Sequence, residues 1–368
     1  MAFHFGSLFG QKNPPLIGLD IGSSAIRLVE LSAPLKNIFR LEHCASEALP
    51  HGAVVDGNIE NIAQVTDAIH RVLIKSGSKA RLVALGMPPA VVITKKIILP
   101  GGMSDDELEI QVENEAGQYI PFTLDEVSLD FDVLGIAPNA PDDIEILLAA
   151  TRKEKVEDRI AVAEAVGLQP RVMDIESYAA RAVTEHIGSG LEGGSEGKII
   201  ALFQIGANVT HVSMQLDGQV LYEREQPFGG SHLTQDIARA YGLSFEEAES
   251  KKRSNELSAE QSTELPTNYE REYRAPFIES AAAEIARAIQ FFFTATPYTR
   301  VDQIYLAGGC AAMPGLRERV AVHTRCACAV MNPFEGMQVA PSVREKQLAA
   351  DAPAFLVACG LAMRRFDQ

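Results

Sequence analysis

Residues 16–31, LIGLDIGSSAIRLVEL, decide the fold. The run Leu16–Ile21 has the apolar character of a buried strand. The run Ala25–Leu31 alternates between two faces, as a half-covered strand does. The short segment 22–24 between them predicts a hairpin loop. This part of the chain is therefore expected to open a sheet with two antiparallel strands.

The loop of this hairpin has the residues of a phosphate site. Gly22 has no Cβ, so a ligand can approach the backbone closely there. Backbone N–H groups together with the hydroxyls of Ser23 and Ser24 can cradle a phosphate. Asp20, at the end of the first strand, could hold a hydrated Mg²⁺. A plain turn is the alternative interpretation of the same residues.

A second stretch, Ala201–Met214, repeats the pattern of strand, glycine turn and strand. Gln204 takes the place of Asp20, and Gly206 takes the place of Gly22. Two copies of one element suggest two similar lobes that face each other. The candidate phosphate ligands in this second copy are Gln204, Gly206, Ala207 and Asn208.

Two further glycine pairs stand where strands give way to helices. In Ile304–Leu316, an apolar strand is followed by Gly308 and Gly309 and then by a helix, which lets a flat ring or a phosphate lie against bare backbone. Gly229 and Gly230 precede another helix, whose first N–H groups suit an anion. Both pairs are predicted to face the ligand of the two hairpins.

Composition limits the class of protein. The chain has 368 residues, which suggests two lobes, and a net charge of −16, which argues against binding to nucleic acid or anionic lipid. No apolar run is long enough to span a membrane, and no secretory signal is expected. The segment Met1–Lys12 is interpreted as a docked or frayed terminus, with a membrane-touching helix as the alternative. The five cysteines are expected to be reduced.

Taken in order, the chain predicts a first lobe interrupted by a smaller unit. The expected parts are the start of the first lobe at 14–90, an inserted small α/β subdomain at 91–174, a helix between the lobes at 175–187, a second lobe at 198–345 with an outer subdomain at about 231–300, and a C-terminal helix at 346–368 that returns to the first lobe. Within the inserted unit, Ser104–Glu107 predicts a capping box, and 137–143 predicts a Pro-rich loop.

Together these features resemble the actin-like ATPase superfamily, which includes actin, heat-shock chaperones and FtsA. Within it, the chain is most similar to the PilM family of cytoplasmic type IV pilus assembly proteins, from about residue 14 to the end. The segments that carry the resemblance are 18–24, 106–109, 118–122, 147–156, 174–179 and 228–230. The resemblance implies an α/β, actin-like (ribonuclease H-like) fold of two lobes, with the extra subdomain in the first lobe.

The resemblance also implies roles for single residues. Glu176 matches the place where relatives put the polar residue that positions the attacking water, although a Glu in the first turn of a helix also suits the helix dipole. Glu284 and Arg287 match the residues that contact ribose and adenine in relatives. Their spacing of three residues also predicts a simple ion pair on a helix surface.

From these residues we expect ATP to bind between the lobes, with Mg²⁺ near Asp20 and adenosine against Gly308 and Gly309. Actin has an Asp where this chain has Gln204, and a neutral amide cannot serve as a base, so at most weak ATPase activity is expected.

By resemblance, the chain is a scaffold at the inner face of the inner membrane. It is expected to bind the cytoplasmic N-terminal tail of PilN, other pilus platform proteins and the extension ATPase, without inserting into the membrane. The alternatives are an FtsA-like division protein and a sugar or acetate kinase of the same superfamily.

Overall fold

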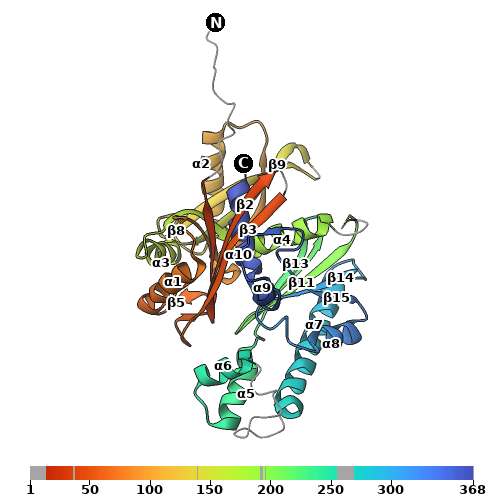
Figure 1. The fold of residues 1–368 in the computed structure, drawn as a ribbon. Helices are drawn as coiled ribbons and strands as arrows, with labels where there is room; N and C mark the ends of the chain where they lie inside the picture. The colour runs from red at the N-terminus through yellow and green to blue at the C-terminus, as the bar shows by residue number, and fades with distance from the viewer. Residues whose placement is uncertain are drawn as a thin grey trace.

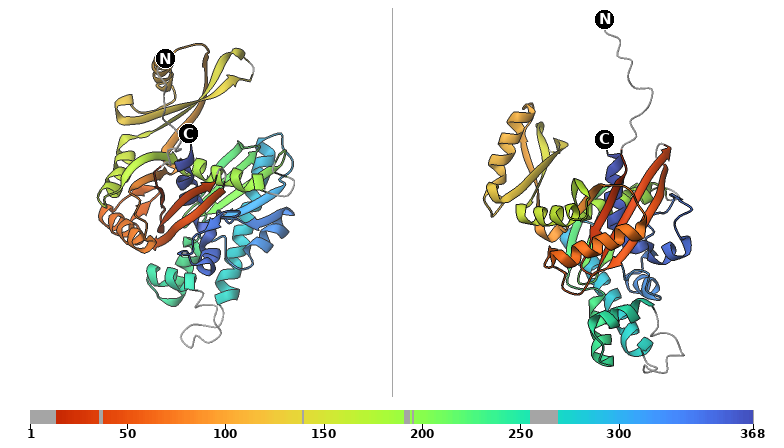
Figure 2. Two further views of the ribbon diagram at one scale, coloured as in Figure 1. Left: turned by 45° about the horizontal axis from the view of Figure 1, so that its top comes forward. Right: turned by 60° about the vertical axis from the view of Figure 1, so that its left-hand side comes forward.

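The structure is a computed structural model that describes residues 14–35, 38–138, 140–190, 194, 196–254 and 269–367. The segment Met1–Lys12, interpreted above as a docked or frayed terminus, lies outside these residues. Two lobes lie side by side, each built on a sheet, and a third, smaller sheet projects from the first lobe (Figures 1 and 2). In the part of the chain that is described, no helix is both long and apolar enough to cross a membrane.

The first lobe is a six-stranded sheet in the order β10-β6-β1-β2-β3-β16. Helices α1 (Ile62–Ser76) and α3 (Lys153–Glu164) cover one of its faces and share a core with β1 and β6. The Asn61 side chain caps the start of α1. The strands are β1 (Leu16–Ile21), β2 (Ala25–Leu35), β3 (Ile38–Ala48), β6 (Leu82–Met87), β10 (Gln169–Ile175) and β16 (Gln338–Val339), with the small hairpin β4 (Val54–Val55) and β5 (Asn58–Ile59) beside them.

The second lobe has a five-stranded sheet in the order β13-β12-β11-β14-β15. Strand β11 is antiparallel to β12 and parallel to β14. In the first lobe, β1 is likewise antiparallel to β2 and parallel to β6. The duplication predicted from the two glycine turns is thus present in the pairing of the strands. The elements are β11 (Ile199–Ile205), β12 (Thr210–Leu216), β13 (Gln219–Gln226), β14 (Gln303–Ala307) and β15 (Ala327–Val330), with α7 (Ala275–Ala295) and α8 (Leu316–Thr324) on one face.

Two helices, α4 (Glu176–Gly190) and α10 (Leu356–Met363), lie between the sheets and share a core with both (Figure 1). Their close packing depends on glycine. A Cβ on Gly360 would lie 1.9 Å from the carbonyl oxygen of Ala179 in α4, and a Cβ on Gly18 would lie 2.1 Å from that of Ala358. Helix α10 packs against β1, β2 and β6 of the first lobe, and the segment that contains it also includes α9 (Glu345–Asp351), η5 (Ala352–Phe355) and η6 (Arg364–Phe366).

The projecting sheet consists of β7 (Val92–Pro100), β9 (Ala140–Arg152) and β8 (Val127–Ala137), with α2 (Asp105–Ala116) packed on one face. Ser104 and Glu107 form the predicted capping box at the start of α2. The predicted unit 91–174 extends too far, because α3 and β10 join the first-lobe core and sheet. The predicted loop 137–143 is also shorter, since β8 and β9 pair as far as Ala137 and Ala140.

The remaining helices form the outer part of the second lobe, at the foot of Figure 1. They are α5 (Ser231–Tyr241), α6 (Phe245–Ser254) and the π-helical turn η4 (Glu270–Arg274), which continues into α7; short turns η1 (Pro89–Val91) and η2 (Leu124–Glu126) flank the inserted sheet. The cysteines are free, as predicted.

Candidate functional site

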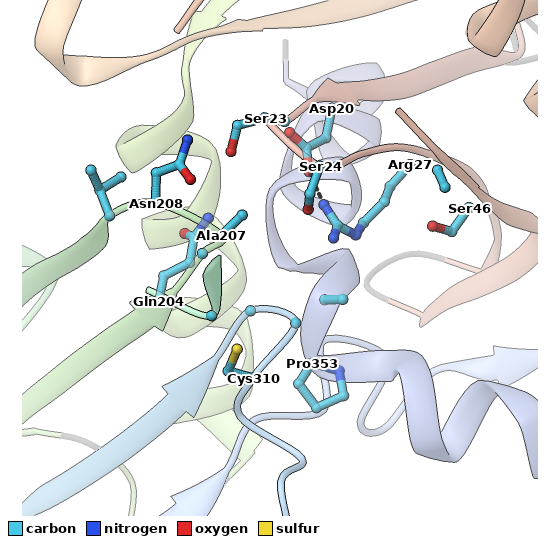
Figure 3. A pocket seen from close by; sticks show the side chains of 18 of the residues that line it. Asp20, Ser23, Ser24, Arg27, Ser46, Gln204, Ala207, Asn208, Cys310 and Pro353 are labelled. Atoms are coloured by element: carbon cyan, nitrogen blue, oxygen red, sulfur yellow. Dashed lines mark hydrogen bonds and ion pairs between the residues drawn. The ribbon is translucent and has the colours of Figure 1, made fainter. Parts of the chain in front are cut away.

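A cleft of about 790 Å³ lies between the two lobes, and both hairpin turns open into it (Figure 3). Ser23 and Ser24 stand on one side, and Ala207 and Asn208 stand on the other. The structure brings most of the predicted site residues together along this cleft. These are Asp20, Gly22, Ser23, Ser24, Glu176, Gln204, Gly206, Ala207, Asn208, Gly230, Gly308 and Gly309.

The two hairpin turns are closed in the same way. The N–H of Gly22 donates to the carbonyl oxygen of Ala25 at 3.2 Å, and the N–H of Gly206 donates to that of Val209 at 2.9 Å. These bonds fix the two turns, whose tips then face the cleft. The Asn208 side chain is held from behind, because the hydroxyl of Ser231 donates to its Oδ1 at 2.9 Å.

Two of the predicted glycines are needed for backbone to pass close to backbone. Gly308 has a φ of +90°, and a Cβ there would lie 2.3 Å from the carbonyl oxygen of Ile205. A Cβ on Gly229 would lie 2.3 Å from that of Ala207. Gly229 does not itself line the cleft; it supports the second hairpin from behind. At both glycines the Cβ side is thus filled by the backbone of the second hairpin, so these residues hold that turn in place.

Asp20 is almost completely buried and forms an ion pair with Arg27, with Oδ2 and Nη1 3.3 Å apart. Burial raises the pKa of Asp20, and the positive charge of Arg27 opposes that rise. Among the described residues, no group of three or more His, Cys, Asp or Glu side chains could hold a metal ion. The residues present therefore fit a Mg²⁺ that keeps its waters and phosphate ligands and uses one carboxylate, rather than a metal held by protein alone.

Glu176 is the first residue of α4 and points toward the end of β6. A Cβ on Gly86 would lie 2.8 Å from the Glu176 Cγ, so this glycine makes room for the side chain. Burial, with a smaller contribution from the negative charge of Asp20, raises the pKa of Glu176 to about 8. At neutral pH the carboxyl group therefore keeps its proton. It can donate a hydrogen bond, but it is a poor base for activating water.

Arg159, on α3, is a buried charge close to these two carboxyl groups that the sequence analysis missed. It is fully buried, and burial lowers its pKa while Glu176 and Asp20 oppose the shift. The sequence carries a signal for it, because Arg159 stands three and four residues before the buried Val162 and Ala163 and so shares their helix face. A lone Arg on an apolar helix face needs partners inside the protein.

The cleft wall formed by the second lobe has further polar residues that were not predicted. Lys252 is held in place by Glu249 at 2.6 Å, by the carbonyl oxygen of Gly230 at 3.0 Å and by the hydroxyl of Thr234 at 2.7 Å. Arg253, Tyr269 and Arg274 also line this wall, and their positions depend on how α5, α6 and η4 pack, which local sequence patterns do not indicate. His211 and Glu225 line it from the strands β12 and β13.

Glu284 and Arg287 are not brought into the cleft. They form an ion pair on the surface of α7, with Oε1 and Nη1 3.0 Å apart, and the Arg287 side chain is 58% exposed. This is the simple pair that their spacing of three residues predicts. The role in contacting adenosine that the resemblance implied has no support in this arrangement, since the cations on this side of the cleft come from α6 and η4 instead.

Comparison with known proteins identifies the family. A sequence model of the family described as type IV pilus assembly protein PilM matches residues 18–366. The chain belongs to the PilM family. Among solved structures it is similar to one titled "PilM-PilN type IV pilus biogenesis complex", with 26% identity, a TM-score of 0.77, and coverage of 96% of this chain and 99% of that one.

More distant structures share the fold of the PilM family chain. The ethanolamine utilization protein EutJ from Carboxydothermus hydrogenoformans has 18% identity and a TM-score of 0.55, with 95% of this chain and 89% of that one covered. MreB5 of Spiroplasma citri bound to ADP has 13% identity and a TM-score of 0.50, with 97% and 100% covered. The actin-like, two-lobe α/β fold that the resemblance implies is confirmed, and the FtsA-like and kinase alternatives are not favoured.

Proposed function

We propose that this chain is a nucleotide-binding scaffold of type IV pilus assembly and that its nucleotide is ATP. The observation that carries the proposal is the shared cleft, into which two matching hairpin turns open from opposite lobes. Turn tips with backbone N–H groups and hydroxyls suit a polyphosphate, which would join one lobe to the other. That MreB5 was solved with ADP supports an adenine nucleotide as the ligand.

The residues suit the parts of ATP as follows. Ser23 and Ser24 would contact the phosphates from the first lobe, and Ala207 and Asn208 would contact them from the second. Gly308 and Gly309 offer bare backbone to the base, and Lys252 and Arg274 supply positive charge at that side of the cleft. When bound, Mg²⁺ would neutralise phosphate charge, and Asp20 is the side chain placed to hold it through water.

Hydrolysis is expected to be slow. Gln204 offers an amide where a carboxylate would be needed to act as a base. Glu176 keeps its proton at neutral pH because burial raises its pKa to about 8. A cleft with these two groups can order a nucleotide and a water without removing a proton from that water. We infer that the bound nucleotide sets how the lobes close, and through this the affinity for partners.

The partner that we propose is the cytoplasmic N-terminal tail of PilN, because the most similar structure described above is a PilM–PilN complex. The chain would then be peripheral to the inner membrane, held there by PilN, and would offer other faces to further platform proteins and to the extension ATPase. The inserted sheet is the proposed contact region for the tail, since it is the part of the first lobe that projects away from the cleft.

The test is a pair of titrations of the full chain by calorimetry. The first uses ATP and ADP with Mg²⁺ and with EDTA, and we expect binding that depends on Mg²⁺. The second uses a synthetic peptide of the PilN N-terminal tail, with a scrambled peptide as its control, in the presence and absence of Mg-ATP. No nucleotide binding would refute the cleft assignment, whereas no difference between the peptide and its scrambled control would refute the choice of partner.

A further inference from the structure

Arg159 is the largest fully buried side chain among the described residues, and its hydrogen bonds join separate parts of the first lobe. Its Nε donates to the carbonyl oxygen of Gly86 at 2.8 Å, and its Nη2 donates to that of Gly57 at 3.0 Å. A buried guanidinium is costly unless its N–H groups are satisfied and its charge is balanced. The two carbonyl groups accept two of its N–H groups, and the negative charges of Asp20 and Asp158 nearby offset its positive charge.

The two carbonyl groups lie beside the connection that enters the inserted sheet. Gly86 is the last residue but one of β6, and Pro88 follows β6 in the connection through η1 into β7. Gly57 lies in the turn between β4 and β5, and a Cβ on it would lie 2.6 Å from the Pro88 Cγ. Arg159 itself is on α3, which follows β9 without a break, so it belongs to the connection that leaves the sheet. One side chain on the outgoing connection is therefore bonded to first-lobe backbone beside the incoming one.

The same segments form part of the cleft wall. Asp56, Gly57, Pro88 and Ala90 all line the cleft, from the β4–β5 turn and from the connection into β7. Glu176 also lines it and packs directly against Gly86. The connection into the inserted sheet and the β4–β5 turn are thus part of this wall of the nucleotide cleft. A shift of the sheet that moves α3 changes the position of Arg159 relative to the carbonyl groups of Gly57 and Gly86.

We propose that Arg159 is the positioning residue that couples the inserted sheet to the nucleotide cleft. When a peptide binds to the sheet, the guanidinium transmits the change to the β4–β5 turn and to Glu176, and so alters the affinity for nucleotide. This inference rests on the function proposed above, because it needs a nucleotide in the cleft and a peptide on the sheet. By linkage, the nucleotide must alter the affinity for the peptide by the same factor.

The decisive variant is Arg159→Lys, which keeps the positive charge but loses the fork of donors that reaches two carbonyl groups at once. The affinity of the full chain for Mg-ATP is measured with and without the PilN peptide, and the ratio of the two values is the coupling factor. In the wild type we expect a factor of about five or more, the lower end for allosteric proteins. In Arg159→Lys it should fall to less than about twofold, while each ligand still binds alone.

Arg319→Lys is the matched control, because it makes the same change on the exposed surface of α8, where Arg319 pairs with Glu279. It should keep the wild-type coupling factor. A wild-type factor of one, or an unchanged factor in Arg159→Lys, would overturn the inference. If the wild type bound neither nucleotide nor peptide, the proposed function would fail instead.

A second measurement on the wild type covers the case in which Arg159→Lys does not fold. Amide hydrogen exchange is recorded for the segments 54–59 and 153–164 before and after peptide addition, without nucleotide. We expect a change of at least about twofold in exchange rate in 54–59, since this turn is bonded to Arg159. Exchange that is unchanged there, while the peptide is bound, would overturn the inference independently of any variant.

Discussion

Replacing Glu176 with Gln should change the way in which stability depends on pH. Burial raises the pKa of this carboxyl group from 4.5 to about 8 in the folded chain. The folded state therefore binds the proton more tightly than the unfolded state. The stability that this proton provides is complete below pH 4.5, falls as the pH rises, and is lost above a pH of about 8.

The size of this change in the free energy of unfolding follows from the titration of the single carboxyl group of Glu176. Between the two pKa values, the free energy of unfolding falls by about 1.4 kcal/mol for each pH unit. From about pH 5.5 to about pH 7.5 the wild type should thus lose about 2–3 kcal/mol through Glu176 alone. Glu176→Gln has the shape of the protonated acid but no titration, so this loss disappears. Contributions from groups that do not interact with Glu176 cancel in the difference between the two proteins, and Asp20, which does interact with it, is the main exception.

The assay is urea denaturation of both proteins without nucleotide at several pH values across this range. The free-energy difference between them should change steadily in favour of the variant as the pH rises. Glu164→Gln, an exposed position on α3, is the control for the removal of a surface carboxyl group, and its effect on the free energy of unfolding should stay within about 0.5 kcal/mol. A flat difference for Glu176→Gln, or one that moves in favour of the wild type, would show that this carboxyl group is ionised at neutral pH.

Three further substitutions test the cleft. Gly308→Ala puts a Cβ 2.3 Å from the carbonyl oxygen of Ile205 at a φ of +90°. The ATP affinity measured by calorimetry should therefore fall about tenfold or more, and an unchanged affinity would contradict this close approach of the two backbone segments. Phe245→Ala removes a contact with His51 that joins the lobes, in which the two ring centroids lie 4.1 Å apart. Stopped-flow measurements should then show ATP release a few-fold faster than in the wild type, and an equal rate would argue against the contact. Glu284→Gln breaks only a surface ion pair, so ATP affinity should stay constant and the free energy of unfolding should fall by less than about 1 kcal/mol. A clear loss of ATP affinity would show that Glu284 and Arg287 do contribute to the nucleotide site.

The parts of the site that the sequence predicts are those with local signals. Each hairpin consists of adjacent residues, so its strands, its turn and its glycine can be recognised without knowing the rest of the fold. Because the same pattern occurs at Asp20–Gly22 and at Gln204–Gly206, the sequence also predicts two similar lobes that face each other. The pairing of strands in the structure agrees with this expectation.

The sequence predicts less well the features that depend on contacts between segments far apart in the chain. The strand pattern of Gln169–Ile175 does not say which sheet it joins, so the inserted unit was extended past Arg152 to a strand that in fact pairs with β6. Glu284 and Arg287 were assigned to the cleft by resemblance, whereas their spacing alone predicted the surface pair that is observed. Arg159 was missed because its partners stand 73 and 102 residues away in the sequence.

The helix α10 between the sheets has a consequence for how the protein is made. Its contact with Gly18 closes one face of β1, although some 340 residues separate the two in the chain. While a ribosome is still producing the second lobe, only α4 is available to pack on that face, and the apolar side chains that α10 covers stay exposed. The first lobe can thus be built early but is completed only when residues 356–363 emerge, and until then the exposed apolar surface favours aggregation.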